Sequence, residues 1–192
     1  MASKSLEFEY QEDDRPIKLF FQNEARFGRI DNVCSCRVLP GRRAHAGNQI
    51  IRKYTCLYGS FCQETGEQFS MILPYANGEC MNIFLKEFSE HFAQYRVIMG
   101  MDNAPCHTEE MKKHIVPLFQ PAYSPELNPA EHIWQYIRES GGFKNRTFNS
   151  IQEVEDKLCE AVNMLLTDKN KIKSITGFKW ILSAISNNMI AV

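Results

Sequence analysis

Two carboxylates, Asp102 and Glu131, each lie in a stretch that gives the acid a defined structural setting. Asp102 ends the apolar run that begins at Tyr95 (YRVIMGMD), which is typical of a buried strand delivering an acid at its exposed carboxyl end. Glu131 follows the proline-rich turn YSPELNPA, which predicts that it falls in the first turn of a helix. Carboxylate oxygens are the ligands that hard cations such as Mg²⁺ prefer, so the pair predicts a divalent-metal site.

The elements that position these acids follow from the period of the apolar residues. Met81, Phe84 and Phe88 recur at spacings of three and four, which predicts an amphipathic helix after an N-cap at Asn77. Short apolar and β-branched runs bounded by turn residues predict strands over 17–22, 34–39, 52–62, 68–73, 95–102 and 116–120. Further helices are expected over 108–114, 131–140, 151–166 and 178–187.

This order of elements predicts one α/β domain. Residues 52–62 and 68–73 are joined through the turn 64–66 as an antiparallel meander, and a crossover helix then leads to strands that lie parallel. A mixed five-stranded sheet, three strands antiparallel plus two parallel and flanked by helices, is the order of the ribonuclease-H-like fold. Its site has acids at the ends of the first and fourth strands and at the start of a late helix, which here are Asn23, Asp102 and Glu131.

A third acid matters because phosphodiester chemistry is favoured by two divalent ions about 3.5 to 4 Å apart. One ion activates the attacking oxygen and the other stabilises the leaving oxygen. Asn23 offers a neutral carbonyl oxygen in place of an anionic pair, so we expect metal affinity to fall sharply. Glu24 is adjacent, but neighbouring residues on a strand point to opposite faces, which makes it a poor replacement.

Five stretches together resemble the catalytic domain of mariner-type bacterial insertion-sequence transposases, the DDE superendonucleases. The Y-S-P-x-L-N-P-x-E-x-x-W signature is long and rarely met by chance, whereas D-N-A alone is weak. The stretches are FFQNEARFGRI (20–30), ILPYANGECMNIFL (72–85), MDNAPCH (101–107), YSPELNPAEHIW (123–134) and SITGFKWI (174–181).

The resemblance implies roles for particular residues. Asp102 matches the second catalytic acid and Glu131 the third, both as metal ligands, and Asn23 occupies the position of the first. The implied cofactor is Mg²⁺ or Mn²⁺, with two ions in an active form. The implied function is metal-dependent DNA strand cleavage and strand transfer during DNA transposition, impaired here by Asn23. The implied partners are DNA, as transposon ends and target, and a second copy in a homodimer, with no membrane.

Members of the family resemble a two-part design in which helix-turn-helix modules recognise the element's ends. Here residues 1–16 form only an N-terminal extension ahead of the catalytic domain, 17–192. We therefore expect end recognition to reside outside this sequence.

Composition sets wider bounds on the protein. At 192 residues and 22.2 kDa the chain fits one domain with a sizeable core, and no apolar run is as long as a membrane span. Seven scattered cysteines without a C-x-x-C pair suit a reducing cytoplasm. The net charge of -1 and the pI near 6.5 argue against a free-standing, non-specific nucleic-acid binder.

Basic residues nevertheless gather locally, and such clusters either contact phosphates or form a solvated face. By the resemblance, the loop 40–49 lies where such transposases meet DNA and one another, and plain surface is the alternative. His107 either contacts phosphate or a metal-bound water, or is a surface residue at a helix start. The candidate DNA contacts are Arg37, Arg42, Arg43, His45, Arg52, Lys53 and His107, and a second cluster is Lys169, Lys171, Lys173 and Lys179.

Both acids also have a purely structural interpretation. Glu131 completes a capping box with Asn128 as N-cap, and Asp102 forms an Asx turn as the chain leaves its strand. The coincidence of both acids with the fold order and the long signature favours a catalytic ancestry. The alternative function is a catalytically inactive, domesticated or regulatory module for DNA binding or dimerisation. A general ribonuclease-H-like hydrolase is disfavoured by the signature around Glu131, and Trp134 is expected in the core.

Overall fold

The computed structural model of the protein describes residues 14–30, 35, 37–43, 45, 49–102, 114–179 and 181–183. The strands are β1 (Ile17–Ile30), β2 (Ile50–Phe61), β3 (Gln68–Leu73), β4 (Arg96–Met101) and β5 (Ile115–Phe119). The helices are α1 (Gly78–His91), the 3₁₀ turn η2 (Pro125–Leu127), α2 (Ala130–Ser140), α3 (Ile151–Thr167) and α4 (Lys169–Thr176).

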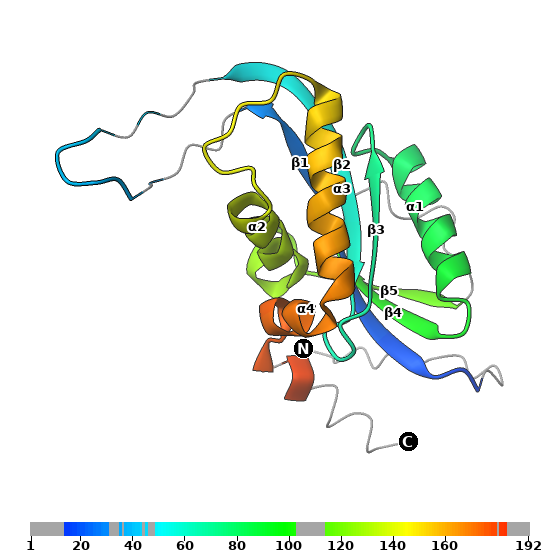
Figure 1. The fold of residues 1–192 in the computed structure, drawn as a ribbon. Coiled ribbons are helices and arrows are strands. Elements are labelled where there is room, and N and C mark those ends of the chain that lie inside the picture. The colour runs from blue at the N-terminus through cyan, green and yellow to red at the C-terminus, as the bar shows by residue number, and fades with distance from the viewer. Residues whose placement is uncertain are drawn as a thin grey trace.

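The five strands form one mixed sheet in the order β3-β2-β1-β4-β5. β1 to β3 pair antiparallel, whereas β4 lies parallel to β1 and β5 parallel to β4. Helix α1 covers one face of the sheet and the helices α2, α3 and α4 lie on the other (Figure 1). The predicted five-stranded α/β arrangement is therefore confirmed. Among the described residues, no helix is both long and apolar enough to cross a membrane.

The two faces hold two separate apolar cores, because successive strand residues point to opposite sides. On one face Phe20 packs against Phe88 of α1 with ring centroids 5.2 Å apart. On the other, Phe61 packs against Trp134 of α2 at 5.6 Å, which confirms Trp134 as a core residue. β1 contributes to both cores, Phe20 to the first and Ala25 and Phe27 to the second, and Asn23 lies on this shared strand.

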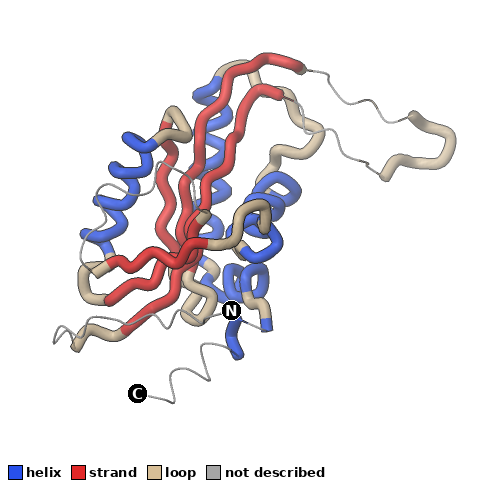
Figure 2. Tube along the Cα trace, turned by 180° about the vertical axis from the view of Figure 1, so that it is seen from behind, coloured by secondary structure: helices blue, strands red, loops and turns tan. Residues whose placement is uncertain are grey.

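The first strand is longer than predicted. It continues past residue 22 to Ile30, so Asn23 lies within β1 and not at its end. The sequence signal for this extension is the alternation of the buried Ala25 and Phe27 with the exposed Arg26. The charged residues of the segment 23–30 nevertheless resemble those of a loop. The strand expected over 34–39 is wrong for Ser35 and for 37–39, which belong to the β1–β2 connection. Figure 2 shows the described part of this connection standing clear of the body.

The remaining predictions mostly hold within a residue or two. The N-cap at Asn77 is confirmed, because its side chain accepts a hydrogen bond from the Cys80 amide at 2.9 Å. Helix α4 was not predicted, since its lysines resemble a solvated tail. Of the helix expected over 108–114 only His114 is described, and it is a turn residue. Of the one expected over 178–187, Lys179 and 181–183 are helical and 180 and 184–187 lie outside the description. Four described cysteines, Cys56, Cys62, Cys80 and Cys159, are free.

Gly59 allows α2 to approach the sheet beside Asn23, its partner across the β1–β2 ladder. A Cβ at this glycine would lie 2.7 Å from Cη2 of Trp134. We expect Gly59→Ala to lower the free energy of unfolding by about 1–3 kcal/mol, because a well-packed core resists added volume. Urea unfolding of Gly59→Ala, Trp134→Phe and the double variant measures this. If the loss of unfolding free energy in the double variant equals the sum of the losses in the two single variants, the clash is contradicted, because substitutions at contacting residues should not be additive.

Candidate functional site

Positions 23 and 102 both follow directly after the paired part of the parallel strands β1 and β4. The last pair between the parallel strands β1 and β4 is Phe21 with Gly100, and Asn23 and Asp102 each lie two residues further on. Val97, Met99 and Met101 are buried against α1, so the alternation of β4 directs Asp102 toward the face that carries α2. Asp102 is exposed, as expected for an acid at the carboxyl end of a buried strand.

Asn128 fixes the start of α2 against β1 at the point where the pairing of β1 with β4 ends. Its buried side-chain amide donates a hydrogen bond to the backbone carbonyl of Gln22 at 2.9 Å. Its carbonyl oxygen accepts from the Ala130 amide at 3.1 Å, which satisfies a free N–H at the helix start. The prediction of Asn128 at the N-cap is wrong by one residue, because Pro129 occupies that position, but the Asn128 side chain still satisfies an amide at the helix start. Its bond to Gln22, 106 residues away, has no signal in the sequence.

Glu131 uses its carboxylate for a contact with β1 and not for a capping box. Its Oε1 accepts a hydrogen bond from Nδ2 of Asn23 at 2.9 Å. The backbone N–H of Asn128, which a capping box would engage, donates to Pro125 instead. The Oδ1 of Asn23 in turn accepts from the Glu24 amide at 2.9 Å. The amide group of Asn23 thus lies with its donor toward the acid on the helix.

Glu24 lies close enough to both Asp102 and Glu131 for their charges to affect its carboxyl. Burial raises the pKa of its carboxyl, a hydrogen bond from Gln22 opposes that rise, and the charges of Asp102 and Glu131 add to it. Its neighbours in the alternation of β1, Phe20 among them, pack on the α1 face. Glu24 is therefore an electrostatic neighbour of the acids and lies on the opposite side of the strand, as the sequence predicts.

Two carboxylates are the candidate donors for a hard divalent cation at this site. Asp102 and Glu131 provide carboxylate oxygens, which Mg²⁺ and Mn²⁺ accept. Position 23 directs N–H, which repels a cation, toward Glu131. Within the described ranges, no three His, Cys, Asp or Glu side chains are grouped so that they would hold a metal ion.

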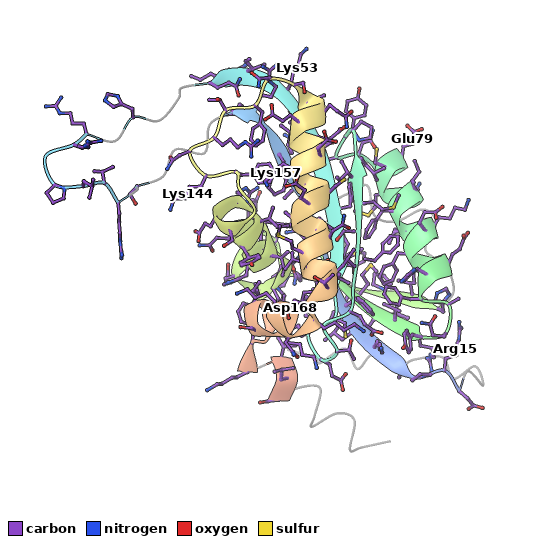
Figure 3. All side chains as sticks on the ribbon, in the orientation of Figure 1. Arg15, Lys53, Glu79, Lys144, Lys157 and Asp168 are labelled. Carbon is purple, nitrogen blue, oxygen red and sulfur yellow. The ribbon has the colours of Figure 1, made fainter. Side chains whose placement is uncertain are left out.

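The candidate DNA contacts fall into two groups. Arg37, Arg42, Arg43 and His45 are exposed on the β1–β2 connection, and Arg37 lines a hollow with Lys144. Arg52 and Lys53 lie at the outer end of the β1–β2 ribbon, where Figure 3 labels Lys53. His107 lies outside the described residues. Lys169, Lys171 and Lys173 lie on α4.

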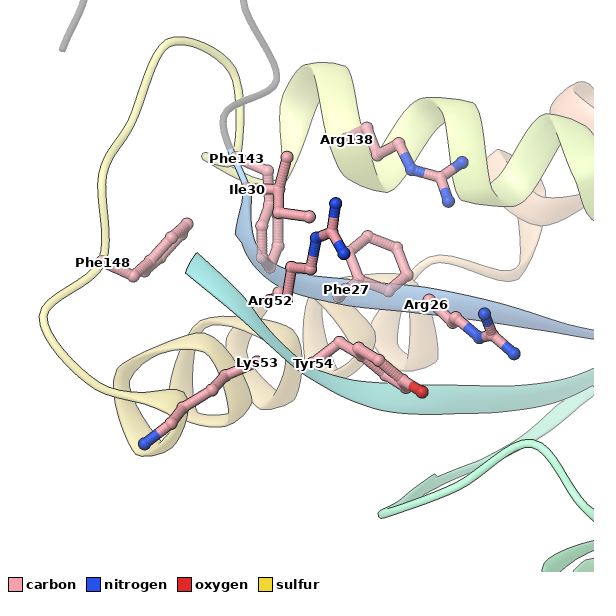
Figure 4. A pocket seen from close by; sticks show the side chains of 10 residues that line it. Arg26, Phe27, Ile30, Arg52, Lys53, Tyr54, Arg138, Phe143 and Phe148 are labelled. Carbon is pink, nitrogen blue, oxygen red and sulfur yellow. The ribbon is translucent and has the colours of Figure 1, made fainter. Parts of the chain in front are cut away.

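Two further cations, Arg26 and Arg138, were missed by reasoning from sequence. Both line a hollow with Arg52 and Lys53. The available signal for Arg138 was its place seven residues after Glu131, because residues two turns apart lie on the same side of a helix. Nothing in the sequence indicated that Arg26 of β1 would line the same hollow (Figure 4).

The sequence profile described as DDE superfamily endonuclease matches residues 18–155. Over 128 residues the chain is 30% identical to the uncharacterized protein y4pE/y4sA of Sinorhizobium fredii (strain NBRC 101917 / NGR234), covering 65% of this chain and 94% of that protein. Over 178 residues it is 21% identical to the transposable element Tc3 transposase of Caenorhabditis elegans, covering 82% of this chain but 52% of the transposase. The chain thus spans about half of that relative.

Among solved structures, the Mos1 strand transfer complex superposes with a TM-score of 0.56 and 20% identity, covering 84% of this chain and 55% of that one. The Mos1 mariner paired end complex with Mn gives 0.56 and 20%, covering 83% and 54%. This likeness confirms the ribonuclease-H-like fold that the order of elements predicted.

The role of Asn128 as an anchor predicts a graded loss of stability. We expect Asn128→Ala to lower the free energy of unfolding by about 2–4 kcal/mol, because it removes a helix cap and leaves the Gln22 carbonyl without its donor. Asn128→Ser keeps a capping acceptor but does not reach Gln22, so it should recover only the capping part. Wild-type stability of both variants in denaturant unfolding would refute the anchor.

The amide bridge at position 23 predicts that Asn23→Asp makes stability depend on metal. In EDTA this variant should be less stable by about 1–3 kcal/mol, since a hydrogen bond to a charged acceptor becomes a repulsion between carboxylates. Added Mg²⁺ should raise its melting temperature more than that of the original chain, because a ligand of the folded state stabilises it. Asn23→Ala, which lacks both the bond and the repulsion, is the control. Equal Mg²⁺ effects in all three proteins would rule out the bridge.

Proposed function

The chain belongs to the DDE superfamily endonucleases, and from this membership we propose that it is the catalytic domain of a transposase that cleaves DNA and transfers the freed strand. The observation that carries the proposal is the hydrogen bond between Asn23 and Glu131, with Asp102 at the matching position of the adjacent strand. This contact between residues 108 positions apart supports the assignment of positions 23, 102 and 131 to one site.

We propose Asp102 and Glu131 as the catalytic and metal-holding acids, and position 23 as the third ligand in an active form. The relevant Mos1 structures contain Mg or Mn, which supports a divalent cofactor here. When bound, two such ions activate the attacking oxygen and stabilise the leaving oxygen of a phosphodiester. The chain's own contribution is to hold the acids in place: β4 delivers Asp102 and the Asn128 anchor sets Glu131 opposite β1.

Asn23 impairs this activity. Its Nδ2 donates a hydrogen bond to Glu131 without a cation. An active form needs a metal ligand at this position instead. The same contact favours the second candidate function, an inactive domain retained for DNA binding or dimerisation. The structural role of the bridge would then persist after the loss of catalysis.

We propose that residues 17–192 are the catalytic part and that recognition of the element's ends lies beyond them. The chain covers 52% and 56% of the Tc3 and Tcb2 transposases. The partners proposed with this function are transposon ends, target DNA and a second copy of the chain in a homodimer. The likeness to the Mos1 transposase paired-end complex with a left transposon end supports the first of these. The scattered free cysteines support a cytoplasmic setting.

The proposed function predicts that Asn23→Asp restores metal-dependent cleavage. With a helix-turn-helix module supplied and DNA carrying the ends of the source element, we expect nicking in Mg²⁺ or Mn²⁺ to rise at least about 100-fold, the effect of several kcal/mol of charge stabilisation. Asn23→Asp with Asp102→Ala and Asn23→Asp with Glu131→Gln are the controls and should remain inactive. No gain in nicking, or cleavage that survives Asp102→Ala, would reject the catalytic assignment and leave the inactive module.

A further inference from the structure

The sheet ends on one side at β3, an edge strand without charged residues. Its sequence, QFSMIL, contains neither a charge nor a proline. In Figure 1, β3 lies between α1 and α3, and no described element passes in front of it. Natural proteins usually block an edge strand with charges or proline, because its free backbone groups pair readily with another strand. The composition of β3 therefore favours pairing over protection.

The hydrogen-bond register shows which backbone groups of β3 are available. The Cys62 amide donates to the Glu67 carbonyl at 2.8 Å, so this pair is hydrogen-bonded across the two strands. Because bonded and non-bonded pairs alternate in an antiparallel ladder, the odd-numbered residues of β3 direct their N–H and C=O groups toward β2. The even-numbered residues, Gln68, Ser70 and Ile72, direct theirs away from the sheet. Among the described residues, none bonds to the outward backbone groups of Ser70 and Ile72.

The opposite edge of the sheet, β5, is protected by a proline. The Gln120 amide donates to the Met101 carbonyl at 2.9 Å, so the even-numbered residues of β5 face β4 and the odd-numbered ones face outward. Pro117 belongs to the outward set and has no N–H, which interrupts the row of donors on that side. The chain thus blocks the β5 edge by a device that β3 lacks.

Exposed apolar side chains flank the β3 edge on both covering helices. On α3, the Val162 carbonyl accepts a hydrogen bond from the Gln68 side chain, and Leu166, which is 50% exposed, lies one turn further on the same side. On α1, the His91 ring lies 5.4 Å from the phenyl ring of β3, and Ile83, which is 43% exposed, lies about two turns earlier on the same side. A single bound peptide strand would leave these side chains exposed, whereas a folded domain would cover them.

The β3 edge is complementary to a second copy of itself in an antiparallel register centred on Ser70. In that register Ser70 lies opposite its own counterpart and Gln68 opposite Ile72, so the outward backbone groups of both strands meet. Between these pairs Phe69 lies opposite Met71, a contact of ring and sulfur that the two-fold symmetry repeats. No like charges oppose each other within the strand, because it carries none.

We propose that two copies of this chain pair through their β3 strands to form one continuous antiparallel sheet across both domains. Ser70 lies on the two-fold axis, and the helices α1 and α3 of each copy lie beside their counterparts. The contact is isologous, so the assembly closes at the dimer. The inference assigns a surface to the proposed homodimer and to that extent rests on the proposed function, but the pairing itself requires neither DNA nor a metal ion.

Residue-resolved hydrogen exchange, in EDTA and without DNA, tests whether a second copy covers the edge. We expect the amides of Ser70 and Ile72 to become protected as the protein concentration rises. The amides of Phe69 and Met71, which bond to β2, are the internal control and should be protected at every concentration. Protection of Ser70 and Ile72 that does not depend on concentration would overturn the proposal, because another segment of the same chain would then cover the edge. Fast exchange of both amides at every concentration would also overturn it.

Sedimentation velocity of variants measures the contribution of the edge to the dimer. Ser70→Pro removes an N–H that faces away from β2, so the β2–β3 ladder stays intact. We expect it to raise the dissociation constant of the dimer at least about tenfold, since the two-fold symmetry loses the same hydrogen bond twice. Ser70→Lys, which places like charges opposite each other on the axis, should act in the same direction and serves if Ser70→Pro does not fold.

Two matched controls separate the edge from general effects of substitution. Ser70→Ala keeps the backbone donor and should dimerise like the original chain. Phe119→Lys adds the same charge to the other edge strand, at a residue that is 40% exposed, and should also leave the dimer unchanged. Equal dimerisation by Ser70→Pro and the original chain would overturn the proposal, as would an equal loss in Phe119→Lys or growth of the assembly beyond a dimer.

A cross-link tests the register. In a Cys159→Ser background, which removes an exposed thiol, Ser70→Cys should form an intermolecular disulfide with oxidised glutathione, because directly opposite residues have Cα atoms about 5.5 Å apart. Gln68→Cys, which lies opposite Ile72, should not cross-link, and equal cross-linking by both would reject the register. A dimer that Ser70→Lys disrupts, in a protein that Asn23→Asp cannot reactivate, would support the edge and reject only the catalytic function. Cleavage by an Asn23→Asp protein that stays monomeric would reject only the edge.

Discussion

The hydrogen bond from Asn128 to the Gln22 carbonyl is the constraint on which the candidate site depends. It occurs where the parallel ladder between β1 and β4 ends, so a side chain from the turn before α2 takes a carbonyl that the sheet leaves available. Since the same side chain caps the helix start, the direction of α2 is fixed together with its position. Glu131 then reaches β1, and Trp134 settles against Gly59 one turn later.

Asn23 stands where the resemblance implies an acid, and its amide changes what holds the candidate site together. Three carboxylates at these places repel one another and need cations between them, whereas the amide of Asn23 donates directly to Glu131. With Asn at position 23, the chain can therefore hold Glu131 against β1 without a metal ion. With Asp there, repulsion between the carboxylates would destabilise the same arrangement. The geometry of the site and its ability to perform chemistry are in this way separable, which is why catalytic ancestry and present activity are distinct questions for this protein.

The length of β1 decides where Asn23 lies in the sheet. Had the strand ended at Gln22, as its sequence suggested, the acids would stand at the edge of the domain. Because β1 continues to Ile30, it forms with β2 a ribbon that extends beyond the end of β4. Ala25 and Phe27 of this extension face the helices α2 and α3, whereas Arg26 lies on the opposite face, across the ladder from Cys56.

The sequence by itself determined most of the order of elements and the core positions of α1, and it indicated Asp102 and Glu131 as candidate acids, because these depend on local periodicity and on one long signature around a turn. It also indicated that position 23 departs from the family pattern, because Asn23 stands where the resemblance implies an acid. Only the tertiary structure decided that Asn23 bridges to Glu131 and that Asn128 anchors the helix to Gln22. These contacts join residues about a hundred positions apart, and their partners are set by strand register and helix docking, which no local pattern encodes.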